Sequence, residues 1–111
     1  MTSSPTDYTD LGCWRDSGRR AIPILEGTDK RLRGDYHRRR DAIEVCYQVA
    51  FERGFNYFAV QDGGWCAASA NAGSRYNMYG RSRNCRGHGK GGPAANRVYK
   101  MSGNIFYIVG R

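Results

Sequence analysis

Four cysteines do most to limit the folds open to this chain, because they stand far apart, at positions 13, 46, 66 and 85 of 111 residues. They contain no Cys-x-x-Cys pair, and their spacing from the two histidines does not match a zinc finger, so we expect no metal site. An even number of widely spaced cysteines in a small domain predicts two disulfides and an oxidising compartment. Of the possible pairings we favour Cys46–Cys66, which would tie a helix to the strand after it, and Cys13–Cys85, which would tie the first strand to a late loop.

The segment 54–66 carries the clearest local pattern in the chain. Residues 56–62 are largely aromatic and apolar, which is typical of a buried strand, and Gly63-Gly64 predicts a turn directly after them. Trp65 and Cys66 follow the turn. This segment therefore predicts a core strand, a disulfide end and a flat aromatic ring close together.

A single helix is predicted before that strand. Apolar residues recur at the spacing of one buried helix face, at Ile43, Cys46, Tyr47 and Ala50. Asp41 with Glu44 resembles a capping box, and Gly54 predicts the helix end.

The arginine run 38–40 lies just before this helix, where cations are unfavourable. Two interpretations stay open. Either the helix begins earlier, near Asp35, with the arginines solvated on its outer face, which we favour, or the arginines point at a bound anion.

The predicted fold class is α+β, with one central helix packed on a small antiparallel sheet and long glycine-rich loops. We expect a flexible tail over residues 1–7, which lacks an apolar signal core, and a single domain over residues 8–111. No stretch of about 18 apolar residues predicts a transmembrane segment. The predicted strands lie near residues 8–14, 20–25, 56–62, 97–101 and 104–109, the last two joined by a hairpin at Ser102-Gly103.

The positive net charge of the chain favours acidic partners. Lysine and arginine number 18 against 10 acidic residues, a formal net charge of +8. Such a balance favours sulfated or carboxylated glycans, phosphate groups or anionic surfaces, although it also serves solubility. Most of these cations are arginines, whose planar fork makes paired hydrogen bonds to carboxylate and phosphate groups.

Several motifs together resemble a secreted module. They are Leu-Gly-Cys-Trp-Arg-Asp (11–16), Arg-Ala-Ile-Pro-x-Leu-Glu-Gly (20–27), Ala-Ile-x-x-Cys (42–46), Gly-Phe-x-x-Phe-Ala-Val-Gln-x-Gly-Gly-Trp-Cys (54–66), Tyr-Gly (79–80) and Gly-Lys-Gly-Gly-Pro-x-x-Asn-x-Val-Tyr (89–99). Over roughly residues 8–101 the chain resembles the WSC domain. That family usually has eight cysteines, so this chain, with four, resembles a four-cysteine variant of it. The resemblance implies an apple-like helix-on-sheet fold, secretion and carbohydrate binding at cell surfaces.

A carbohydrate site needs aromatic faces for stacking and planar polar groups for the hydroxyls. Aromatic candidates for stacking are Trp65, Tyr76 and Tyr79, and hydrogen-bonding candidates are Gln61, Asp62, Asn71 and Asn77. Arginines at Arg75, Arg81 and Arg83 would add selectivity for acidic sugars. A second interpretation has Trp65 packing on the Cys46–Cys66 disulfide and Asp62 capping the turn at the two glycines.

We expect first a non-catalytic, extracellular glycan-binding or adhesion module without a cofactor. Repeated domains or oligomers would raise its avidity. The alternative is a cationic defence or polyanion-binding protein acting on anionic membranes or nucleic acid, although disulfides argue against an intracellular nucleic-acid partner. An enzyme with His37 and His88 as base and acid is not expected, because no local motif supports it. A purely structural matrix role is the remaining option.

Overall fold

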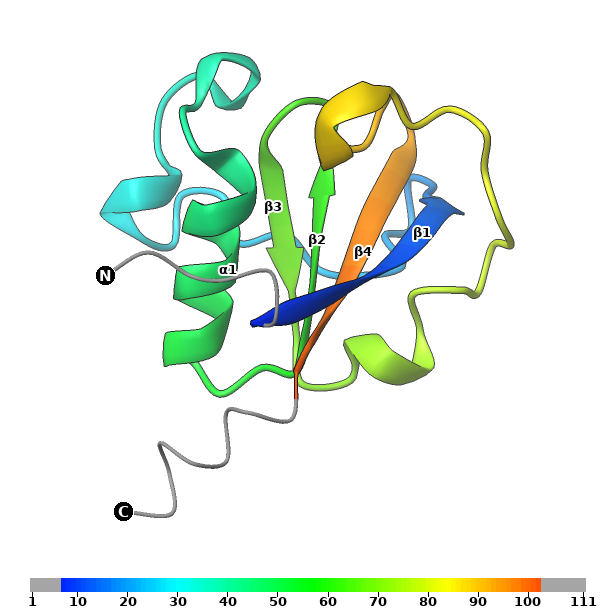
Figure 1. Cartoon of the computed structure of the whole chain (residues 1–111), viewed down its shortest axis with the longest axis horizontal. Coiled ribbons are helices and arrows are strands. Elements are labelled where there is room, and N and C mark those ends of the chain that lie inside the picture. Colours follow the sequence, from blue (N-terminus) through cyan, green and yellow to red (C-terminus); the bar gives the residue numbers. More distant parts are fainter. Residues whose placement is uncertain (1–6, 103–111) are drawn as a thin grey trace.

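The computed structural model of the chain describes residues 7–102. Its sheet consists of β1 (Tyr8–Arg15), β2 (Tyr57–Gln61), β3 (Trp65–Ala68) and β4 (Ala95–Met101), all antiparallel, in the order β1-β4-β2-β3. Helix α1 (Ala42–Glu52) packs on β2 and β3 (Figure 1). Short 3-10 turns lie at Lys30–Leu32 (η1), Tyr36–Arg38 (η2), Ala72–Ser74 (η3) and Gly87–Gly89 (η4). The predicted α+β fold, with one helix on a small antiparallel sheet, is confirmed.

Both favoured disulfides are present, Cys46–Cys66 and Cys13–Cys85. The first joins α1 to β3, and the second joins β1 to the loop that precedes η4. Such pairs fit an extracellular protein, because disulfides persist in oxidising compartments. Among the described residues, no helix combines the length and the apolar character that crossing a membrane requires.

Alternation along the strands divides the buried side chains between the two faces of the sheet. Phe58, Val60 and Cys66 face α1, and Ala59 and Ala67 face the opposite side. On that opposite side the cover consists of loops, chiefly residues 21–22 and 72–79. The molecule therefore has a helix layer, a sheet layer and a loop layer.

The structure confirms the predicted end of α1 at Gly54. Gly54 has a φ of 77°, and the N–H groups of Gly54 and Phe55 donate to the carbonyls of Phe51 and Ala50. This pair of bonds is a Schellman motif, which needs a residue with positive φ at the position of Gly54.

The N-terminal end of α1 corrects two predictions. Asp41 adopts a left-handed conformation, with a φ of 52°, and its side chain makes no capping bond, so the predicted capping box is wrong. The helix starts at Ala42 and not near Asp35. The physical reason is Arg39, whose side chain is only 6% exposed and forms a two-bond ion pair with Glu26. With this side chain held at Glu26, the backbone of Arg39 is extended, which interrupts helical geometry between η2 and α1.

One strand prediction is wrong, and one strand of the sheet was not predicted. Residues 20–25 form no strand, and within the described chain their only ladder contact is an isolated bridge between Ile24 and Ala67. Pro23 lacks the N–H that a longer ladder needs. β3 was not predicted, because its small residues resemble a loop more than a strand. The predicted strand 104–109 and residues 1–6 of the predicted tail lie outside the described residues.

Candidate functional site

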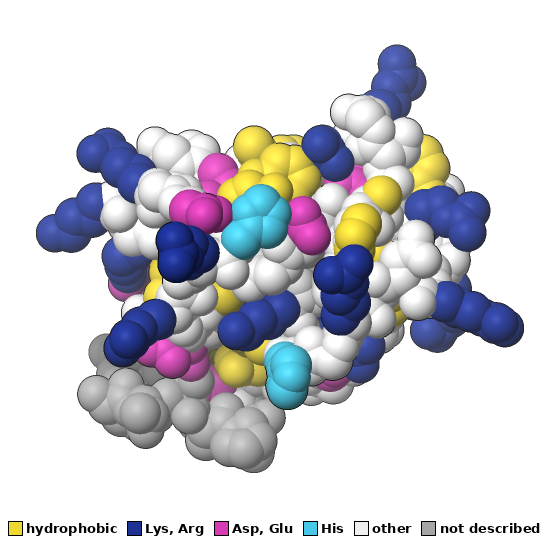
Figure 2. All heavy atoms as spheres, turned by 90° about the horizontal axis from the view of Figure 1, so that it is seen from above, with side chains coloured by type: hydrophobic (Ala, Val, Ile, Leu, Met, Phe, Trp, Pro, Cys, Tyr) yellow, Lys and Arg dark blue, Asp and Glu magenta, His cyan; other side chains and the backbone are white. Residues whose placement is uncertain are grey.

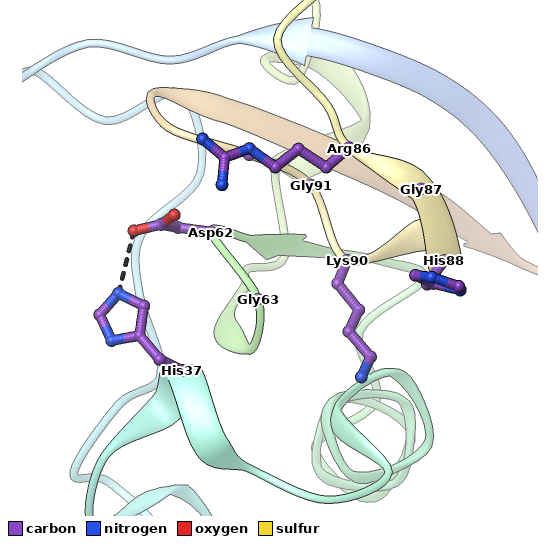
Figure 3. A pocket seen from close by; sticks show the side chains of 9 residues that line it. His37, Asp62, Gly63, Arg86, Gly87, His88, Lys90 and Gly91 are labelled. Atoms are coloured by element: carbon purple, nitrogen blue, oxygen red, sulfur yellow. Dashed lines mark hydrogen bonds and ion pairs between the residues drawn. The ribbon is translucent and has the colours of Figure 1, made fainter.

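A pocket of about 240 Å³ lies where three segments meet at one end of the sheet. The segments are η2, the turn between β2 and β3, and the glycine-rich loop around η4 (Figure 3). Its lining residues are His37, Asp62, Gly63, Arg86, Gly87, His88, Lys90, Gly91 and Gly92.

The glycine-rich loop is held in place by the sheet and by a disulfide. Cys85, bonded to Cys13, fixes the start of the loop, and the N–H of Gly63 donates to the carbonyl of Lys90 over 3.0 Å. Gly91 lies so close to the carbonyls of Val60 and Ala95 that a Cβ there would overlap them, and its φ is 70°. Only glycine fits this position, so the backbone directly after Lys90 can pack against the sheet.

The pocket is rich in positive charge. Arg86 and Lys90 line it, and among the described residues neither forms an ion pair. Figure 2 views the molecule from above, and both histidine side chains lie on this face with lysine or arginine side chains between and around them. The pocket's one carboxylate, Asp62, belongs to the turn and has a φ of 50°, a conformation that Asp tolerates in turns.

His37 bridges two carboxylates at the pocket rim. Its Nδ1 lies 3.0 Å from Oδ1 of Asp35, and its Nε2 lies 3.1 Å from Oδ2 of Asp62. The hydrogen bonds with Asp35 and Asp62 raise the pKa of His37. The hydrogen bond between Asp35 and His37 also lowers the pKa of Asp35. Both ring nitrogens are engaged, so His37 has no free nitrogen to act as a general base in this arrangement.

A row of planar groups leads away from His37 along the rim. The rings of His37 and Tyr36 stack at 4.1 Å between centroids, Tyr36 and Trp65 are 5.9 Å apart, and the guanidinium of Arg20 lies 4.4 Å above the Trp65 ring. We call Arg20, Trp65, Tyr36 and His37 the planar row. Trp65 therefore stands near the pocket, with one ring face covered by Arg20.

Gln61, although adjacent to Asp62, lies inside the protein. It is 6% exposed, and its Nε2 donates to Oδ2 of Asp16 and to Oδ1 of Asn96, both at 2.9 Å. We call Asp16, Gln61 and Asn96 the interior polar cluster. The side-chain nitrogen of Asn96, Nδ2, is buried there and has no hydrogen-bond partner within the described residues. The sequence predicted that Gln61 would bond a ligand, but the structure points its side chain inward, to Asp16 and Asn96.

The other sequence-predicted site residues lie on the loop layer, apart from the pocket-lining residues. Arg75 donates to the carbonyls of Ala21 and Arg20, and Tyr79 donates to the carbonyl of Arg19, so both hold the loop to the segment 19–21. Two further members pack around Trp14: Tyr76 lies edge-on at 5.1 Å, and Arg81 lies 4.4 Å above the ring.

Three further predicted residues, Asn71, Asn77 and Arg83, are exposed. Asn71 accepts a hydrogen bond from Ser69, and Arg83 forms no ion pair within the described structure. The structure thus brings Asp62 and Trp65 to the pocket region and leaves the rest of the predicted set elsewhere.

The sequence analysis did not assign Arg86, Lys90, His37 and His88 to a binding site. A signal was present, because basic residues alternate with glycines over 86–92. Positive-φ glycines allow a tight loop that presents its charged side chains together. The described residues contain no group of three or more His, Cys, Asp or Glu side chains able to hold a metal ion.

The chain matches no protein-family model, no curated protein and no solved structure.

Proposed function

We propose that the protein is a non-catalytic extracellular module that binds acidic glycans, with a carboxylate or sulfate group of the sugar seated in the pocket. The observation that carries this proposal is the placement of Arg86 and Lys90, which form no ion pair within residues 7–102, in one pocket with His37 and His88. Charge-assisted hydrogen bonds from guanidinium and ammonium groups are among the strongest contacts an anion can receive.

The surroundings of the pocket suit a sugar better than a bare anion. In the planar row, His37 covers part of Tyr36 and Arg20 covers part of Trp65, and both rings stay partly exposed at the rim. Asp62 offers an acceptor for a hydroxyl group. A ligand that combines an acidic group with hydroxyls and apolar C–H faces would use all three features. The motif resemblance to WSC domains over segment 54–66 points in the same direction.

A competing function has support from a different observation. Exposed arginines without ion pairs are spread over the described surface, among them Arg15, Arg19, Arg33, Arg38, Arg40 and Arg83. Such a surface attracts any polyanion without needing a pocket. In that case binding would follow total charge and not the pocket residues.

A glycan array of neutral, sialylated and sulfated sugars, read at low and at high salt, separates the two functions. We expect binding to a defined acidic sugar that survives moderate salt, because contacts within a pocket are screened less than exposed ones. Arg86→Ala and Lys90→Ala should each weaken binding by about tenfold or more, since each removes a charge-assisted bond.

Arg83→Ala is the matched control, since Arg83 lies in the same loop region but does not line the pocket. If Arg83→Ala weakens binding as much as Arg86→Ala, and salt abolishes both, the pocket proposal is wrong and the diffuse polyanion function holds.

A further inference from the structure

The bridge made by His37 requires a charged imidazole. Nδ1 faces the Asp35 carboxylate and Nε2 faces the Asp62 carboxylate, at 3.0 and 3.1 Å. A carboxylate accepts, so both ring nitrogens must donate, and only the protonated ring carries two N–H groups. The bridge in the structure is therefore complete only when His37 is protonated.

The charged groups around His37 favour that protonated state. Hydrogen bonds with Asp35 and Asp62 raise its pKa above the ordinary value of a histidine. The groups that face His37 or share its pocket come from all the segments packed there: Asp35, Tyr36 and Arg38 from its own segment, Asp62 from the hairpin turn, and Arg86, His88 and Lys90 from the glycine-rich loop.

On deprotonation the two bonds are not equivalent. Asp35 Oδ1 also accepts the backbone N–H of His37 over 3.0 Å, so this local contact is fixed by the backbone. Asp62 lies 25 positions away in the sequence and is held to His37 through Nε2. A neutral ring that keeps its proton on Nδ1 retains the Asp35 bond and loses the bond to Asp62, whose carboxylate then keeps only the weaker, uncharged donor of the neighbouring Tyr36 side chain.

A released Asp62 carboxylate has an alternative partner in the pocket. Asp62 and Arg86 line the same pocket, and the described structure shows no ion pair between them while His37 holds Asp62. Figure 3 shows the guanidinium of Arg86 on the Asp62 side of the pocket, whereas the Lys90 side chain runs in another direction. A free Asp62 would attract the Arg86 guanidinium and so compete with an acidic ligand for it.

We propose that His37 is a positioning residue that makes acidic-glycan binding pH-dependent through Asp62. When charged, it holds Asp62 and leaves Arg86 for the ligand; when neutral, it releases Asp62 to Arg86. Affinity therefore falls as the pH rises through the pKa of His37. This inference rests on the proposed function of the pocket.

The first test needs no ligand. A pH titration of the free protein by NMR follows the His37 ring, the side-chain carboxyl carbon of Asp62 and the guanidinium carbon of Arg86. We expect the Asp62 and Arg86 signals to change with the same midpoint as the His37 ring, while the guanidinium of Arg83 does not change. If Arg86 does not respond at that midpoint, the proposed link from His37 to Arg86 is wrong, whatever the protein binds.

The second test measures affinity for a sulfated hexasaccharide at pH 5.5 and pH 8, at constant ionic strength. We expect the wild-type affinity to fall about fivefold at the higher pH, at the low end of typical couplings because the groups are exposed. His37→Gln should remove this dependence. Asp62→Asn should also remove it, because a neutral amide does not compete for Arg86 at either pH.

His88→Gln is the matched control, because it removes the other histidine of the same pocket. It should keep most of the pH dependence. If His88→Gln abolishes the dependence and His37→Gln does not, His88 is the sensor and the inference fails. If His37→Gln abolishes it but Asp62→Asn does not, His37 contacts the ligand directly and the role of Asp62 fails.

If no acidic sugar binds at either pH, the proposed function fails, and the ligand-free titration still decides whether the link between these side chains exists.

Discussion

Two polar clusters lie next to each other at the same end of the sheet, and they differ in almost every physical respect. The interior polar cluster contains Asp16, whose side chain is 1% exposed, whereas in the rim cluster of Asp35, His37 and Asp62 the side chains are 36 to 56% exposed. Consecutive residues, Gln61 and Asp62, belong to the two different clusters.

Burial explains the contrast. A buried polar group that loses its partner bears its full desolvation penalty, so the interior cluster contributes to stability. An exposed ion pair competes with water and salt, so the rim cluster stabilises the fold little but responds readily to pH and ligands. Similar polar side chains therefore stabilise the fold where they are buried, and are available for the proposed binding where they are exposed.

The largest expected effect comes from Asp16. Its carboxylate accepts from the N–H of Ala21, from Gln61 and from Arg20. Asp16→Ala should lower the free energy of unfolding by about 3 kcal/mol, because buried donors lose their acceptor. Asp62→Ala should cost less than about 1 kcal/mol. Urea unfolding of both variants measures the difference, and equal losses would remove the distinction between the clusters.

Gln61 gives the next largest effect and separates stability from binding. Gln61→Leu should cost about 2 kcal/mol, because Asp16 and Asn96 each lose the amide that donates to them. The affinity of the folded variant for acidic glycans should stay near the wild-type value. A large loss of affinity at full folding, checked by circular dichroism, would instead support the sequence-based prediction that Gln61 contacts the ligand.

The smallest expected effect is in the pH profile of stability, where the clusters act with opposite signs. Burial alone would raise the pKa of Asp16, but hydrogen bonds from Ala21, Gln61, Ser17 and Arg20 outweigh it and lower the pKa. Its contribution is therefore present above about pH 4 and is lost as the pH falls through the lowered pKa.

His37, whose pKa is raised, contributes stability below about pH 6.5, and this is lost as the pH rises through the raised pKa. Melting temperatures measured from pH 3 to pH 9 should show a smaller acid slope in Asp16→Asn and a smaller slope above neutrality in His37→Gln. The acid slope will persist in part, because the pKa of Glu52 is also lowered. If His37→Gln changes only the acid slope, the assignment of the charged bridge is wrong.

Much of the scaffold follows from local sequence patterns. The apolar spacing of α1, its glycine end, the strand before Gly63-Gly64 and the cysteine count each act over a few residues or limit a small set of choices. β3 was missed because Ala67 and Ala68 owe their strand conformation to pairing with β2, which is a tertiary effect.

The candidate site depends far more on contacts between distant segments. Cys13–Cys85 spans 72 positions and fixes the loop that carries Arg86 and Lys90, and Asp62 meets His37 across 25 positions. No local pattern states which side of the strand Gln61 takes, because its partner Asp16 lies 45 positions away. The turn therefore indicated the end of the sheet where the pocket lies, and the long-range contacts determined which side chains line that pocket.

The strand register has a further consequence for how the pocket would be displayed. Tyr8 pairs with Met101 at one end of the sheet, whereas Gln61 pairs with Asn96 at the end that holds the pocket (Figure 1). A tether, a surface attachment or a neighbouring domain joined beyond either Tyr8 or Met101 would start from the end opposite the pocket. Several copies displayed in this way would all present their pockets outward, which is the geometry that converts weak single contacts into strong multivalent adhesion.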